Sequence, residues 1–180
     1  MYFSYERGTN AMNTSRRVTV ECHVRGSAFA GSIGNVVGAL REHNDAGAID
    51  GLTVDVWPDR VCLTEETAEA PIFERYDRLR EWAAARDVSL EPAFQFTERT
   101  MTVIDSVETI LELPVVCLVI RVEGDIEAVA PHSTASAAYT VEDALDDIEA
   151  GRIGTPDGSP PLTRPSDAPR VRDVAGQQSE

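Results

Sequence analysis

The chain has 180 residues, 42% of them hydrophobic, and a formal net charge of −15 from 31 acidic and 16 basic side chains. Every base is arginine, so lysine Schiff-base chemistry and a phosphate-binding loop built on the usual lysine are excluded. The length and hydrophobic content fit one folded domain with tails.

The negative charge is concentrated in the middle of the chain. Residues 18–150 hold nine arginines and 26 acids, whereas the two ends together are slightly positive. Such a body repels itself and nucleic acid at ordinary ionic strength, but at molar salt the Debye length falls to about 3 Å and both penalties shrink. We therefore expect a protein from a halophile. A GC-rich genome would explain the missing lysine but not the excess of acids.

The sequence predicts a cytoplasmic protein without a membrane segment. The first 17 residues lack the apolar stretch of a signal peptide, and the longest apolar run, Val115 to Ile120, is too short to cross a bilayer. Three widely spaced cysteines fit a reducing compartment better than a disulfide framework.

The first half of the body predicts alternating strands and helices. Residues 1–16 are polar and predicted to be disordered. Apolar residues alternate over 18–24, which predicts a half-buried strand, and then recur at helical spacing from Phe29 to Leu40. A second strand is expected over 52–56, a short third over 61–63, and a long helix over about 68–86. The expected cap of that helix is Thr64 or Thr67.

The second half predicts a strand pair and a short helix. Residues 89–113 are predicted to be extended, with a hairpin as one possible form. Pro114 opens the strongest strand, and Glu123-Gly124-Asp125 forms a compact connection to the next strand over 126–130. Thr140 is expected to cap a last helix, and residues 151–180 are predicted to be a disordered tail rich in proline and glycine. Residues 17–150 thus form a single domain.

The order of elements predicts a mixed α/β sandwich. The order strand-helix-strand-helix-strand-strand-helix is thioredoxin-like, with 89–113 as an extra extended segment. In that case the Leu113–Pro114 bond would be cis, although a proline that opens a strand in trans is commoner. The alternative is a ferredoxin-like β-α-β-β-α-β unit over residues 18–98 with an appended hairpin and helix. In either case we expect one dry interior that also contains the cysteine sulfur atoms.

A glycine-rich turn follows the first strand. Gly26 and Gly31 have the spacing of a phosphate-binding loop, but Ser32 stands where lysine is needed, so nucleotide hydrolysis is not supported. Backbone amides at the helix start could still bind a small anion. A tight turn is the competing explanation.

Redox and metal chemistry have no motif here. Cys22, Cys62 and Cys117 lie in predicted strands, where a cysteine behaves as a small apolar residue, and no C-x-x-C occurs. The three histidines show no ligand spacing, so we expect no metal and no cofactor. His132 follows a strand and is the best loop candidate, with an exposed loop histidine as the alternative.

Arginines gather on the second helix. Four residues fall on one face of its helical wheel and are the candidate surface for an anion or a partner: Arg75, Arg78, Trp82 and Arg86. The structural alternative is that Glu74 pairs with Arg78 and that arginine stacks on Trp82.

Several segments resemble a known family. They include Asp50-Gly-Leu-Thr-Val-Asp-Val-Trp-Pro-Asp-Arg-Val, Leu113-Pro-Val-Val-Cys-Leu and Tyr139-Thr-Val-Glu-Asp-Ala-Leu. These resemble small haloarchaeal proteins, some of them labelled helix-turn-helix domains, over roughly residues 18–150. The label implies DNA binding and transcriptional regulation. The predicted elements place a strand between the first two helices, whereas a helix-turn-helix joins two helices by a short turn; a winged arrangement stays open.

The sequence thus predicts a regulatory or interaction module without catalytic residues. Its partner is a protein or DNA. The alternative is a degenerate thioredoxin-like protein or a small-anion sensor without redox catalysis.

Overall fold

The computed structural model describes residues 16–27, 30–64, 70–101 and 106–153. The ends that the sequence predicts to be disordered lie almost entirely outside these residues.

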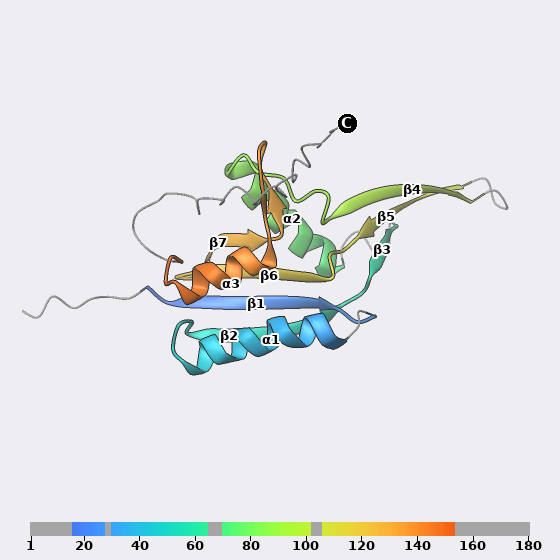
Figure 1. Ribbon diagram of the computed structural model, residues 1–180. Coiled ribbons are helices and arrows are strands. Elements are labelled where there is room, and N and C mark those ends of the chain that lie inside the picture. The colour runs from blue at the N-terminus through green and yellow to red at the C-terminus, as the bar shows by residue number, and fades with distance from the viewer. Residues whose placement is uncertain (1–15, 28–29, 65–69, 102–105, 154–180) are drawn as a thin grey trace, which may run out of the picture.

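A four-stranded sheet forms the centre of the molecule (Figure 1). Its order is β2-β1-β6-β7, with β2 parallel to β1 and β6 antiparallel to both of its neighbours. The strands are β1 (Val18–Arg25), β2 (Gly51–Trp57), β6 (Val116–Val122) and β7 (Asp125–Ala130).

Three helices cover the two faces of this sheet. Helices α1 (Ala30–Asp45) and α3 (Val141–Glu149) pack on one face, and α2 (Pro71–Ala85) packs on the other (Figure 1). The thioredoxin-like order that the sequence predicts is therefore confirmed. The Leu113–Pro114 bond is trans, since the cis bonds of the described chain precede Pro92 and Pro131.

A second sheet extends away from the body (Figure 1). Its order is β3-β5-β4, all antiparallel, from β3 (Arg60–Leu63), β4 (Gln95–Met101) and β5 (Ser106–Glu112). The predicted short strand and the hairpin within 89–113 are thus confirmed. The ferredoxin-like alternative is wrong, because β3 and β4 pair with β5 rather than with the central sheet. Two short strands, β8 (His132–Ser133) and β9 (Ala138–Tyr139), pair before α3.

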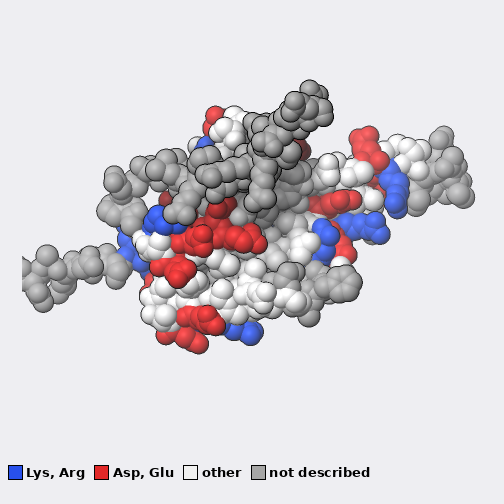
Figure 2. Space-filling view, viewed as in Figure 1, with Lys and Arg blue, Asp and Glu red and all other residues white. Residues whose placement is uncertain are grey.

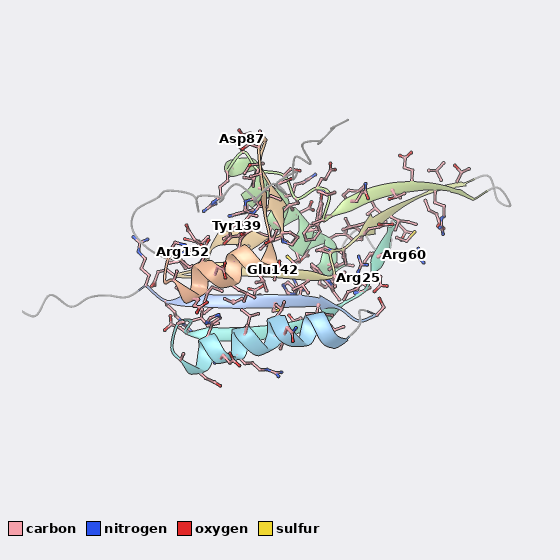
Figure 3. All side chains as sticks on the ribbon, viewed as in Figure 1. Arg25, Arg60, Asp87, Tyr139, Glu142 and Arg152 are labelled. Atoms are coloured by element: carbon pink, nitrogen blue, oxygen red, sulfur yellow. The ribbon has the colours of Figure 1, made fainter. Side chains whose placement is uncertain are left out.

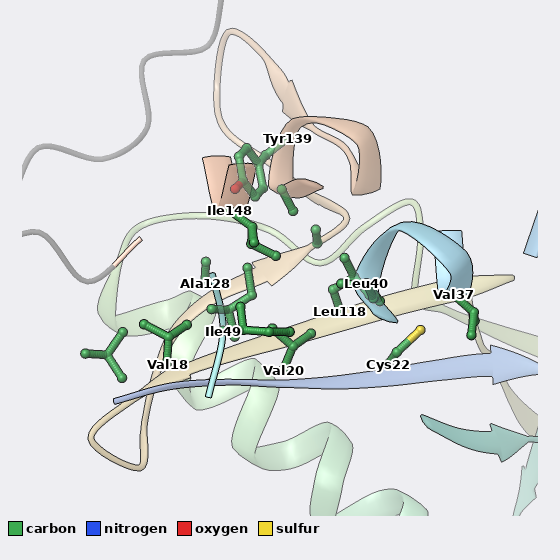
Figure 4. Packing of buried hydrophobic residues seen from close by; sticks show 14 of the residues in the cluster. Val18, Val20, Cys22, Val37, Leu40, Ile49, Leu118, Ala128, Tyr139 and Ile148 are labelled. Carbon is green, nitrogen blue, oxygen red and sulfur yellow. The ribbon is translucent and has the colours of Figure 1, made fainter. Parts of the chain in front are cut away.

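The central sheet is buried on both faces, so the expected single interior is wrong. One cluster lies under α1 and α3 and includes Val20, Cys22 and Leu118 (Figure 4). The other lies under α2 and includes Cys117 and Val119. Neighbouring residues of a strand point to opposite faces, so helices on both sides of the sheet require two separate apolar layers.

The helices start by different means. The Thr140 hydroxyl accepts a hydrogen bond from the Asp143 amide at 3.2 Å, and the Asp143 carboxylate accepts one from the Thr140 amide at 2.8 Å, which confirms the predicted cap of α3. The predicted threonine cap of α2 is wrong: Ala70 occupies the cap position without a side-chain bond, and Pro71 opens the helix. Proline suits this position because it lacks the amide that would need a partner and its φ is already helical.

A buried carboxylate anchors α3. Asp147 is 5% exposed and accepts hydrogen bonds from the Tyr139 hydroxyl at 2.9 Å and from Arg152 Nε at 2.6 Å. In Figure 3 the labelled Tyr139 and Arg152 lie beside this helix. Burial and this carboxylate raise the pKa of Tyr139 well above its ordinary value, so its hydroxyl stays a donor. The network joins α3 to the chain on both sides of it.

Candidate functional site

A cleft of about 330 Å³ lies between α2 and the central sheet. Its apolar lining comes from Leu79 of α2, Val119 of β6 and Ile126 of β7. Its charged lining comes from three strands and α2: Glu21, Asp55, Arg75, Arg78 and Arg121. The volume lies at the lower end of the range of small-molecule sites.

His23 lies inside the protein and contacts the charged residues that line the cleft. The side chain is 0% exposed and stacks on Trp57 with ring centroids 5.1 Å apart. Its Nδ1 lies 3.4 Å from Arg75 Nη1. Because a guanidinium can only donate, Nδ1 is the acceptor and the ring proton is placed on Nε2.

The Nε2 atom of His23 points toward Glu21. It lies 3.6 Å from the Glu21 carboxylate and has no hydrogen-bond partner among the described residues. The Asp55 carboxylate lies 3.8 Å from Nδ1 on the other side of the ring. His23 therefore sits between two carboxylates, with Arg75 above it.

Glu21 is held ionised. Arg121 Nε donates to its carboxylate at 2.7 Å. The nearby His23 and then Arg121 lower the pKa of Glu21 from 4.5 to about 2, despite partial burial. A carboxylate of such low pKa cannot exchange a proton efficiently near neutral pH.

The predicted arginine surface is only partly formed. Arg75 and Arg78 line the cleft together. Arg78 Nη2 also lies 3.9 Å from the Glu74 carboxylate, so the Glu74–Arg78 pair that the structural alternative predicts is present. Trp82, however, is 7% exposed and belongs to the buried cluster under α2, so its place on a binding surface is wrong. Trp82 is buried because a helix that covers a sheet has a wide apolar face, and Trp82 belongs to that face of α2.

Arg86 lies at the far end of α2 from this cleft. Its guanidinium carbon is 5.3 Å from the Trp82 ring centroid, as the stacking alternative predicts. Its Nη2 atom lies 3.7 Å from the Glu127 carboxylate. The structure therefore brings together two of the four predicted residues.

The glycine-rich turn is explained by packing. The Gly26 amide donates to the Trp57 carbonyl at 3.1 Å, and a Cβ on Gly26 would lie 3.2 Å from Val56 Cγ1. Gly31 is exposed within α1, and Ser32 lies next to it in the helix, with its side chain outside the described atoms. A tight turn against β2 accounts for the position of Gly26.

His132 is not an exposed loop residue. It is half-buried in β8, its Nδ1 lies 2.6 Å from the Val129 carbonyl, and its ring contacts those of Trp82 and Tyr139. Burial lowers the pKa of His132. The residue links α2 to β9 through its ring contacts with Trp82 and Tyr139.

The cysteines have the environment that the sequence predicts, with one exception. Cys22 and Cys117 are buried, whereas Cys62 in β3 is half-exposed. Burial raises the pKa of Cys22 to about 11 and that of Cys117 further. In the part of the chain that the structure describes, no group of three His, Cys, Asp or Glu side chains could hold a metal ion.

Sequence reasoning missed Glu21, His23, Asp55 and Arg121. Glu21 and His23 occupy the polar positions of a strand that reads as half-buried, so they indicate a solvated face. The available signal was the thioredoxin-like order itself, in which a helix covers each face of the sheet and encloses these positions.

Comparison with protein families identifies the class of this chain. Residues 12–152 match a family described as a helix-turn-helix domain, and the chain belongs to that family. Neither the curated proteins nor the solved structures contain a match. No helix within the described ranges is long and apolar enough to span a membrane.

The helices of this member are arranged differently from the family description. In the described chain, strands β2 and β3 separate α1 from α2, and the six strands β4 to β9 separate α2 from α3. Among the described residues, no two helices are joined by a short turn, and hence no winged form of that motif is present either.

Proposed function

We propose that the chain is a non-catalytic regulatory module that acts in transcription inside a salt-rich haloarchaeal cytoplasm, with α2 facing DNA. The family supports the class of function. We choose α2 as the helix that faces DNA because of its charge. This helix and its cap Arg86 hold four arginines and three carboxylates, whereas α3 holds five carboxylates and no base.

A non-catalytic role agrees with the chemistry of the ionisable groups. Glu21 has a pKa of about 2, too low for general acid or base work at neutral pH. The thiols of Cys22 and Cys117 are buried with raised pKa values, which disfavours the nucleophilic thiolate.

The test is DNA binding as a function of salt. Fluorescence anisotropy with a labelled duplex of mixed sequence, from 0.1 to 2 M KCl, should show binding that is retained at molar salt, where the repulsion between the acidic body and the duplex is screened. Arg80→Glu changes an α2 side chain that is 66% exposed and lies outside the cleft. It should weaken binding at molar salt, because it replaces a phosphate-facing cation with an anion.

Arg41→Glu on α1 is the matched control. Arg41 is exposed on the opposite face of the sheet, so binding should stay at the wild-type level. Equal losses in both variants would indicate a general charge effect, and a wild-type chain that binds no duplex at any salt would refute DNA binding.

A specific observation favours a second candidate, a small-anion sensor on a thioredoxin-like scaffold without redox catalysis. The turn between β1 and α1 contains no cysteine, and two arginines of α2 line the cleft instead. In this case DNA binding would be absent while a small ligand binds.

A further inference from the structure

We propose that the cleft between α2 and the central sheet binds a small zwitterion of the apolar α-amino-acid class. The cleft has a cationic wall on α2, an anionic wall on β2 and an apolar floor from Leu79, Val119 and Ile126. This inference deepens the second candidate function and does not depend on DNA binding.

The two arginines of the cationic wall have N–H groups available to bind a ligand. In the described chain, Arg75 makes one polar contact, with His23 Nδ1, and no carboxylate lies within 4 Å of it. A guanidinium carries five donors in a planar fork that fits a carboxylate. Arg78 stands one turn further along α2, with its side chain 68% exposed and its ion pair to Glu74 stretched to 3.9 Å. Together they can hold the carboxylate of a ligand.

The anionic wall is Asp55. Its carboxylate lies 3.8 Å from Nδ1 of the neutral His23 ring, which accepts from Arg75 and so has no proton to offer it. The carboxylate of Asp55 is therefore free to accept from a ligand ammonium group. Glu21 is not equivalent, because Arg121 already binds it at 2.7 Å.

The floor suits a short aliphatic side chain. Leu79 and Val119 close the cleft from below, at 2% and 1% exposure, and the half-buried Ile126 offers apolar surface to a ligand. The charged walls and this floor line the same cleft, so a ligand that spans the walls can place its apolar part against Ile126. A volume of about 330 Å³ admits a molecule of the size of leucine.

The first experiment is calorimetric titration of the full chain in 1 M KCl with three probes. L-Leucine has both charges, 4-methylpentanoate lacks the ammonium group, and 3-methylbutylamine lacks the carboxylate. We expect leucine to bind at least tenfold more tightly than either of the other two. Absence of leucine binding, or a truncated probe that binds as tightly as leucine, would overturn the proposal.

The second experiment assigns the two walls. Asp55→Asn should lower leucine affinity at least tenfold and leave the weak binding of 4-methylpentanoate unchanged. Arg78→Gln should weaken both of these probes while 3-methylbutylamine is unaffected. Arg78 is exposed and does not touch His23, so its substitution tests the wall without disturbing the interior.

Controls separate this proposal from DNA binding. Arg41→Gln on α1 and Arg80→Glu on the outer side of α2 should bind leucine as the wild type does. Thermal melting confirms that each variant is folded. Leucine affinity that survives both Asp55→Asn and Arg78→Gln would place the ligand elsewhere and refute this site.

Discussion

His23 and Glu21 determine the electrostatics of the cleft from positions beneath it. His23 is completely buried, yet it contacts an arginine on one side and approaches two carboxylates. Polar groups in such a place cost free energy unless they are paired, and here Nδ1 of His23 is paired with Arg75 while Nε2 lies 3.6 Å from the Glu21 carboxylate. The geometry of Arg75 and Asp55 therefore depends on the protein interior.

Glu21→Gln tests this arrangement through pH. The folded-state pKa of Glu21 is about 2 and its ordinary value is 4.5, so the ionised group stabilises the fold above pH 4.5. That contribution is lost as the pH falls from 4.5 to 2. At pH 7 the variant should be less stable by about 2 kcal/mol, as expected for a hydrogen bond to a charged group.

The measurement is guanidinium unfolding of both proteins at pH 7, 4 and 2.5. The gap between them should close at the lowest pH, and Glu42→Gln on the exposed surface of α1 should show no gap at pH 7. A gap that persists unchanged at pH 2.5 would contradict the role of the Glu21 charge.

The three cysteines should differ in reactivity. Cys22 and Cys117 are buried and their pKa values are raised, that of Cys22 to about 11, so thiolate and access are both lacking at pH 8. Iodoacetamide followed by peptide mass spectrometry should label Cys62 first and the other two only after denaturation. Native labelling of Cys22 at the rate of Cys62 would show that the sheet opens readily.

At the scale of the elements, α2 and α3 contrast in how they begin. The first turn of α3 is closed by a capping box, whereas α2 begins at Ala70-Pro71 with no side chain to bind its free amides. Unpaired amides at a helix start are a cost that a hydroxyl at the cap position removes.

Paired substitutions should therefore act in opposite directions. Thr140→Ala should destabilise the fold by about 1 kcal/mol, and Ala70→Ser should stabilise it by about 0.5 kcal/mol. The backbone of Ala70 is already extended, at φ −66° and ψ 143°, as a cap residue requires. Urea unfolding at pH 7 measures both; a stabilising Thr140→Ala or a destabilising Ala70→Ser would show that packing outweighs the caps.

At the scale of the whole molecule, the unequal distribution of charge is the main feature. On the face that carries α1 and α3, carboxylates gather over α3, and arginines lie mostly toward the periphery of the view (Figure 2). The formal net charge of −15 makes the folded state repel itself at low ionic strength. The cleft differs from this acidic surface, because three arginines line it.

Stability should consequently increase with salt. Raising KCl from 0.1 to 2 M shortens the Debye length from about 10 Å to below 3 Å, which removes most of the repulsion between surface carboxylates. The thermal midpoint of the full chain should rise over this range and rise less in sucrose of equal osmolality. A midpoint that stays flat or falls in KCl would indicate that repulsion does not limit stability.

Local patterns in the chain were sufficient to predict the helices and the central strands in their order, but not the short strands β8 and β9. Alternating valines indicate β1, the apolar run after Pro114 indicates β6, and Thr140 marks the start of α3; all of these depend on neighbours within a few residues. The order of strands and helices then predicted a thioredoxin-like sheet, because connections in such sheets follow few routes.

The candidate site depended instead on the way in which distant segments meet. The pairing of β1 with β2 and β6 brings Asp55 and Arg121 to the same face as Glu21, and α2 then covers that face with Arg75 and Arg78. The same packing buries Trp82 and His23, which the helical wheel and the strand alternation assign to solvent. A single segment shows its own periodicity, but which of its two sides is covered depends on what the rest of the chain places there.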